Sequence, residues 1–107
     1  MQTIITKNFT AKDKFNISGA DGLKNHKDEV LTITDVLVGD FPDKDGNIVT
    51  NAVLKDSEGK IYCSISQAVV KSAIALTEIL ETEACVDVIA RAKESANKRE
   101  YLILELA

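Results

Sequence analysis

The chain of 107 residues has few of the residues on which small catalytic or metal-binding sites depend. Its two cysteines, Cys63 and Cys85, form neither a Cys-x-x-Cys pair nor a zinc-ligand spacing. His26 is the single histidine, and the sequence gives it no obvious acid, Ser or Cys partner. Glycine-rich phosphate loops and nucleophile elbows are also missing. We therefore expect a protein that is not an enzyme and that holds no metal and no cofactor.

Long apolar runs and a cleavable signal peptide are absent as well. The hydrophobic content of 45% is nevertheless enough to fill one modest core without disulfide bonds. We expect a single folded domain without membrane association, in the cytoplasm, with both thiols reduced.

A charge of one sign does not dominate the whole chain, although the net charge is −4. A negative balance argues against an ordinary nucleic-acid binder, because phosphate neutralisation normally dominates affinity. The distribution weakens this objection. Residues 1–27 hold five Lys against two Asp, and residues 28–59 hold eight acids against two Lys. Between Arg91 and Arg99, four bases (Arg91, Lys93, Lys98 and Arg99) face Glu94 alone.

The order of apolar segments predicts a mainly β fold with one helix. Three strands rich in Val, Ile and Thr are separated by turn residues, a helix follows, and two more strands end the chain. This is the layout of a five-stranded oligonucleotide-binding (OB) barrel with its helix between strands three and four. We expect an extended N-terminal arm over residues 1–29 and the barrel over residues 30–107, with strands near Val30–Val38, Ile48–Lys55, Lys60–Ile65, Ala84–Arg91 and Tyr101–Leu106, and a helix over Ser66–Thr82.

Within the arm, Phe15 and Ile17 alternate with polar residues, which makes a short added strand plausible, with residues 19–22 as the turn after it. Ser66 is expected to cap the helix, whose apolar stripe comprises Val69, Ala73, Leu76 and Leu80.

Strand alternation predicts which side chains point outward. In the third strand, Ile61, Cys63 and Ile65 are expected to face the core, and Tyr62 to point outward beside Lys60. In the last strand, Leu102, Leu104 and Leu106 form the expected inner row, with Tyr101 outside. The second strand stays ambiguous, because Ala52 and Leu54 compete with Val49 and Val53 for the core face.

Exposed aromatic rings suit a single-strand binder, because every base can stack on them. The candidate contacts are therefore Tyr62, Tyr101 and Phe41, together with Lys60 and the basic run at the loop between the last two strands, namely Arg91, Lys93, Lys98 and Arg99. The structural alternatives are that both tyrosines cover the barrel edge, that Phe41 folds back on the core and that the basic run is a solvated hairpin.

The segment Glu58-Gly59-Lys60-Ile61-Tyr62-Cys63-Ser64-Ile65-Ser66, followed by an Ala- and Val-rich helix, resembles the single-stranded-DNA-binding protein of small Bacillus phages that prime replication with a terminal protein. Weaker similarities lie at Phe15-Asn16, at Leu23-Lys24-Asn25 and in the final strand. The resemblance implies an OB-type protein that coats displaced single strands during replication, and it implies a stacking role for Tyr62.

The sequence thus favours a non-catalytic single-stranded-DNA-binding protein of a phage or related mobile element, with replication proteins as possible partners. The alternative is an OB-like protein-interaction module that acts as a small accessory or regulatory factor, which the acidic middle segment would suit.

Overall fold

The computed structural model describes residues 4–5, 19–42 and 45–107, and its described part is mainly β with one α-helix. This class agrees with the prediction, and the main strands and the helix fall within a few residues of the expected bounds. The elements are β1 (Ile4–Ile5), β2 (Asp21–Gly22), a 3₁₀-helix (Leu23–His26), β3 (Val30–Pro42), β4 (Ile48–Asp56), β5 (Ile61–Ser64), α2 (Gln67–Thr82), β6 (Val86–Glu94) and β7 (Glu100–Leu106).

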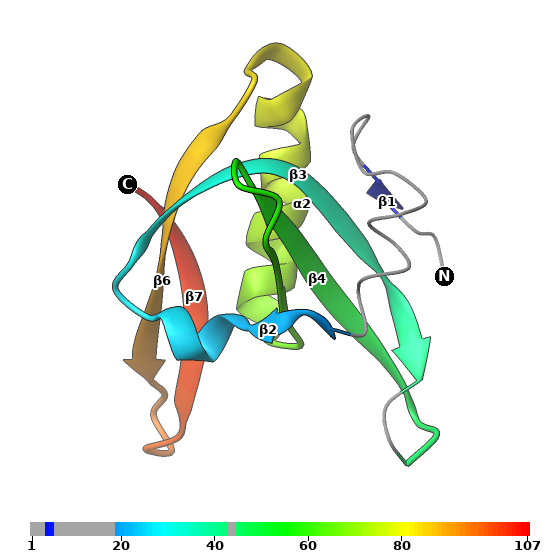
Figure 1. Ribbon diagram of the computed structural model, residues 1–107. Coiled ribbons are helices and arrows are strands. Elements are labelled where there is room, and N and C mark those ends of the chain that lie inside the picture. Colours follow the sequence, from blue (N-terminus) through cyan, green and yellow to red (C-terminus); the bar gives the residue numbers. More distant parts are fainter. Residues whose placement is uncertain (1–3, 6–18, 43–44) are drawn as a thin grey trace.

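One sheet runs through the molecule in the order β2-β5-β4-β3-β6-β7, with β1 paired to β3. It curls into a half-barrel, which agrees with a barrel-like fold (Figure 1). This path contains six strands instead of the expected five. In chain order, α2 therefore follows the fourth of these strands, β5, and not the third. Among the described residues, no pairing joins β7 to β5 or β2, and the sheet therefore stays open.

The additional strand is β2. We expected Asp21 and Gly22 to lie in a turn, but they pair in parallel with Tyr62 and Cys63 of β5. Pairing at a sheet edge uses backbone groups, so a segment with turn-forming side chains can still be recruited. The expected strand at residues 15–18 lies outside the described residues.

The long central strand β3 has different partners along its length. Val30 to Ile33 pair with β6 and Asp35 to Pro42 pair with β4, while Ile33 pairs with both strands. The register with β4 shifts between Ile33 and Asp35, which marks a bulge where the strand passes from one partner to the other.

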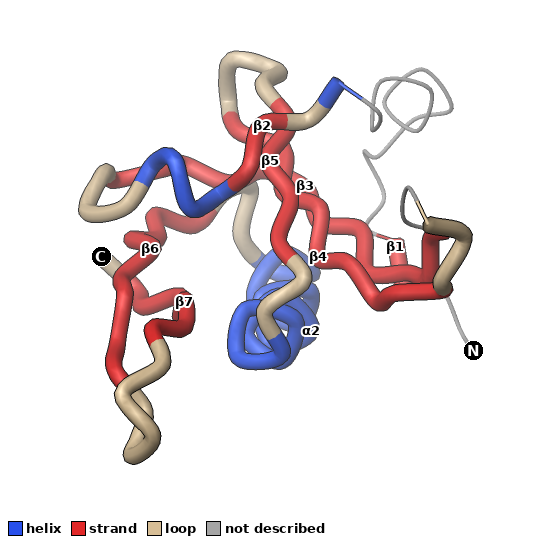
Figure 2. Tube along the Cα trace, turned by 90° about the horizontal axis from the view of Figure 1, so that it is seen from below, coloured by secondary structure: helices blue, strands red, loops and turns tan. Residues whose placement is uncertain are grey.

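Helix α2 lies on the concave side of the curled sheet, where it contacts β3, β4, β6 and β7 (Figures 1 and 2). Its start agrees with the prediction, because the Ser66 hydroxyl accepts a hydrogen bond from the Val69 N–H over 3.5 Å. The buried stripe of Val69, Ala73 and Leu76 was also predicted correctly. Packing against β3, β4 and β6 forms the main core, which comprises Leu23, Leu31, Ile33, Val36, Val38, Ala52, Leu54, Tyr62, Val69, Ala73, Leu76, Val88 and Ala90.

The convex side of the β3–β4–β5 sheet holds a second apolar cluster. Leu37 and Val53 are buried there, and Phe41, Ile61 and Cys63 pack against them. The second strand was ambiguous because both of its faces are apolar: Ala52 and Leu54 belong to the main core, and Val53 belongs to the second cluster.

Residues of the expected N-terminal arm take part in the main core. Leu23 is 1% exposed within that cluster. The His26 ring packs edge-on against Tyr62, with the ring centroids 4.8 Å apart. Its two nitrogens lie 3.2 Å from Asp21 Oδ2 and 3.3 Å from Glu29 Oε2. The stretch from Asp21 to Glu29 is thus held onto the sheet by burial and polar contacts.

Candidate nucleic-acid interface

Tyr62 was the leading candidate for base stacking, and the structure places it inside the molecule. Its side chain is 4% exposed in the main core, so the expectation that it points outward is wrong. Ile61 and Cys63 face the second cluster instead, and Ile65, which we expected in the core, is 64% exposed. Alternation was detected correctly along β5, but the assignment of its two faces was reversed.

The Tyr62 hydroxyl has a structural partner in Asp56. It donates a hydrogen bond of 2.9 Å to Asp56 Oδ2, and Asp56 Oδ1 accepts the backbone N–H groups of Glu58 and Lys60 at 2.9 Å each. Burial, and then the hydrogen bond to Asp56, raise the pKa of Tyr62 to about 12. The pair fixes the β4–β5 turn, and the ring is not available to a ligand.

Two other candidates are also used by the fold. Phe41 is half-buried against Leu37 and Val53, as in the structural alternative. Arg91 donates to Asp28 Oδ1 over 3.2 Å and to Glu105 Oε2 over 3.0 Å. Phe41 therefore offers part of its ring at most, and the charge of Arg91 is compensated.

Lys60 is exposed, but the structure does not bring it to the other candidates. It lies in the turn between β4 and β5, and this turn and the β6–β7 hairpin are well separated in both views (Figures 1 and 2). The predicted set of eight residues is therefore not one surface.

The candidates that remain together belong to the β6–β7 hairpin. Tyr101 points outward as predicted, is 42% exposed, and pairs directly across the strands with Lys93. Opposite residues of an antiparallel pair share a face, with Cβ atoms about 4.5 to 5.5 Å apart. Of the three aromatic residues that the structure describes, Tyr101 is the exposed one. It can stack a planar group while Lys93 lies beside it.

The tip of this hairpin holds two further bases in a defined turn. The Ser95 and Lys98 amides donate to the Arg99 and Ser95 carbonyls at 2.8 and 2.9 Å, and the Arg99 amide donates to Ser95 Oγ at 3.3 Å. Lys98 adopts a left-handed backbone with φ 59. Among the described residues, no carboxylate forms an ion pair with Lys93, Lys98 or Arg99. Within the described part of the chain, the hairpin thus presents three exposed cations that form no ion pair, together with one exposed aromatic ring.

Sequence reasoning missed a second surface, beside the connection from β5 to α2. Two hollows meet at Ile65: one of about 210 Å³ includes Lys24, Asn51 and Ser64 in its wall, and one of about 400 Å³ includes Lys71. The clue in the sequence was Ile65, an apolar residue at the end of a strand directly before a helix cap.

The described residues show no arrangement that is suited to cysteine or metal chemistry. Both cysteines are free thiols, and burial, followed by the charge of Asp21, raises the pKa of Cys63. A raised pKa keeps the thiol protonated, and the thiolate is the nucleophilic form. The described residues contain no group of three or more His, Cys, Asp or Glu side chains suited to a metal ion. No described helix has the length and apolarity needed to cross a membrane.

Comparisons with protein families, curated protein sequences and solved structures found no match to this chain.

Proposed function

We propose that this protein binds single-stranded DNA without catalysis and coats displaced strands during phage or mobile-element replication. The observation that supports the proposal most is the exposed Tyr101 ring opposite Lys93, with Lys98 and Arg99 at the tip of the same hairpin. An aromatic platform beside exposed cations suits a flexible strand, because bases stack while phosphates remain near the positive charges.

The arrangement of the sheet supports an OB-type barrel. A three-stranded meander (β3, β4, β5), a helix and a hairpin (β6, β7) follow one another, with β3 between β4 and β6. The Ser66 hydroxyl donates to the Leu102 carbonyl over 2.6 Å and so links the end of β5 to β7 across the open side. In OB folds the loop between the last two strands borders the ligand, and here that loop is the β6–β7 turn.

The test is a fluorescence-anisotropy titration of labelled oligo-dT with wild-type protein and with Tyr101→Ala. Loss of one stacked base should weaken binding by roughly 1 to 3 kcal/mol, which is about five- to 150-fold, while Tyr101→Phe retains most of the affinity. Lys71→Gln is the matched control on the second surface, and its affinity should stay close to wild type.

Salt dependence tests the electrostatic part of the same proposal. If Lys93, Lys98 and Arg99 each contact a phosphate, log affinity should fall with log salt with a slope of about −2, since single strands give roughly −0.7 per phosphate. Absence of binding at tens of micromolar protein in about 50 mM salt would refute DNA binding, and equal binding to duplex DNA would refute single-strand preference.

A further inference from the structure

Strand β7 has an open edge beside α2. The Leu102 carbonyl accepts the Ser66 hydroxyl, so it points away from β6. Backbone groups alternate in direction along a strand, and the N–H and C=O groups of Leu104 and Leu106 therefore point the same way. No described residue hydrogen-bonds to these groups. Edges of this kind are templates for another strand.

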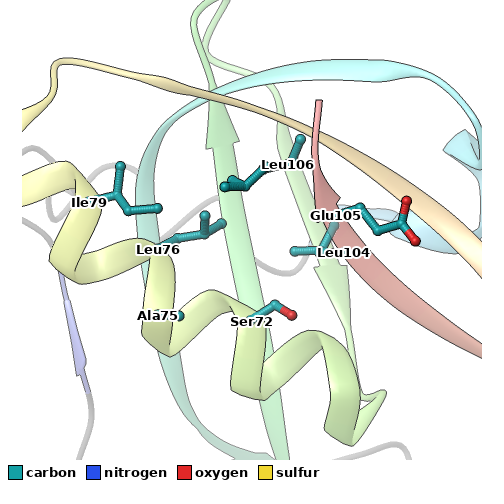
Figure 3. Close-up of a pocket in the computed structure, with 8 residues that line it drawn as sticks. Ser72, Ala75, Leu76, Ile79, Leu104, Glu105 and Leu106 are labelled. Atoms are coloured by element: carbon teal, nitrogen blue, oxygen red, sulfur yellow. The ribbon is translucent and has the colours of Figure 1, made fainter.

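An apolar pocket of about 160 Å³ lies between α2 and this edge (Figure 3). Leu104 and Leu106 point toward the helix, whereas Glu105 points away from it (Figure 3). An apolar cavity of about 150 Å³ is large enough for one benzene molecule, so this pocket can take one large apolar side chain. Its apolar walls include Ala75, Leu76, Ile79, Leu104 and Leu106.

The surroundings are acidic toward the carboxyl end of α2. Glu78, Glu81 and the C-cap residue Glu83 are exposed, and the last helical turn contains no base. The helix dipole adds partial negative charge at the same end. A cationic partner is therefore favoured.

We propose that β7 accepts an extended segment of a partner protein by strand addition. The segment pairs with the backbone of Leu104 and Leu106, places one large apolar side chain in the pocket, and has Lys or Arg near its ends. In this binding mode main-chain hydrogen bonds supply affinity and the pocket supplies specificity. The proposal does not depend on DNA binding, because it uses the opposite end of β7 from Tyr101.

The probe is an end-blocked synthetic peptide, Lys-Thr-Val-Phe-Val-Thr-Lys, titrated into ¹⁵N-labelled full-length protein. Saturable amide shifts are expected at Leu104, Leu106 and Ala75. Ala75→Phe fills the pocket from the exposed side of α2 and should lower the affinity for the peptide by about tenfold or more. Ala96→Phe, in the exposed β6–β7 turn, is the control and should bind like wild type. A peptide with Glu in place of both Lys residues should bind less tightly.

Three results would overturn this proposal. They are the absence of shifts at millimolar peptide, equal affinity of Ala75→Phe with an otherwise native spectrum, and shifts at Leu104 and Leu106 that depend on protein concentration without peptide. The last result would assign the edge to a second copy of the chain.

Discussion

At the scale of single residues, Tyr62 joins three parts of the molecule. Its ring contacts His26, its hydroxyl bonds Asp56, and Asp56 in turn holds the β4–β5 turn. Tyr62→Phe removes one donor to a buried carboxylate and should lower the free energy of unfolding by roughly 1.5 to 3 kcal/mol, measured by urea denaturation. Tyr101→Phe is the control and should leave stability unchanged. Equal stability of Tyr62→Phe and wild type would show that the Asp56 bond contributes nothing.

The Tyr62 bond also predicts a pH dependence. The folded-state pKa of about 12 lies above the ordinary value of 10.0, so the contribution of Tyr62 to stability is complete below pH 10 and is lost as the pH rises through about 12. The difference in unfolding free energy between wild type and Tyr62→Phe should therefore shrink over that interval. A difference that stays constant up to pH 12 would contradict the raised pKa.

At the scale of the elements, Ser66 connects the start of α2 to β7. Its hydroxyl accepts from Val69 and donates to Leu102, so Ser66→Ala loses a helix cap and a link between elements. We expect a cost of about 1 to 3.5 kcal/mol in unfolding free energy, from roughly 0.5 to 2 for the cap and 0.5 to 1.5 for the second bond. Gln67→Ala, at the neighbouring exposed position, is the control.

Ser66→Asp separates the two roles of the Ser66 hydroxyl. A carboxylate still caps the helix but cannot donate to the Leu102 carbonyl, so this variant should recover only the part of the loss that belongs to the cap. If Ser66→Asp is as stable as wild type, the hydrogen bond from Ser66 to β7 contributes nothing to the free energy of unfolding.

The strands and the helix could be predicted from sequence because Gly, Asp and Ser mark where each segment ends, and because Ser66 precedes a regular apolar stripe. The sequence could not predict which face of β4 and which face of β5 meets the main core. Both of their side-chain rows are apolar, and alternation does not say which row meets α2. Parallel pairing of Asp21 and Gly22 with β5 leaves no side-chain pattern, since it uses the backbone. The ion pair between Arg91 and Asp28 could not be predicted either, because the two residues lie far apart in the chain.

At the scale of the whole molecule, the folded unit begins before Val30. Leu23 is buried in the main core although it belongs to the segment that we expected to be an arm. Leu23→Ala should therefore lower the unfolding free energy by roughly 2 to 5 kcal/mol in urea denaturation, the range for a truncated core leucine. Lys24→Ala is the control at the neighbouring position. A change below about 0.5 kcal/mol for Leu23→Ala, the usual size for a surface substitution, would mean that residues 19–29 are only loosely attached.

The divided pairing of β3 has a consequence for the rate at which the chain folds. Its pairing with β4 joins segments separated by one short loop, whereas its pairing with β6 joins Val30 to Ile89 and must close a much longer stretch of chain. Closure entropy rises with the length of the loop, so the two halves of one strand meet different kinetic barriers. The half beyond the bulge can dock early in the meander, and the half before it can pair with β6 only after α2 has brought that strand back. Substitutions in Asp35 to Pro42 should then act mainly on the folding rate, and substitutions in Val30 to Ile33 mainly on the unfolding rate.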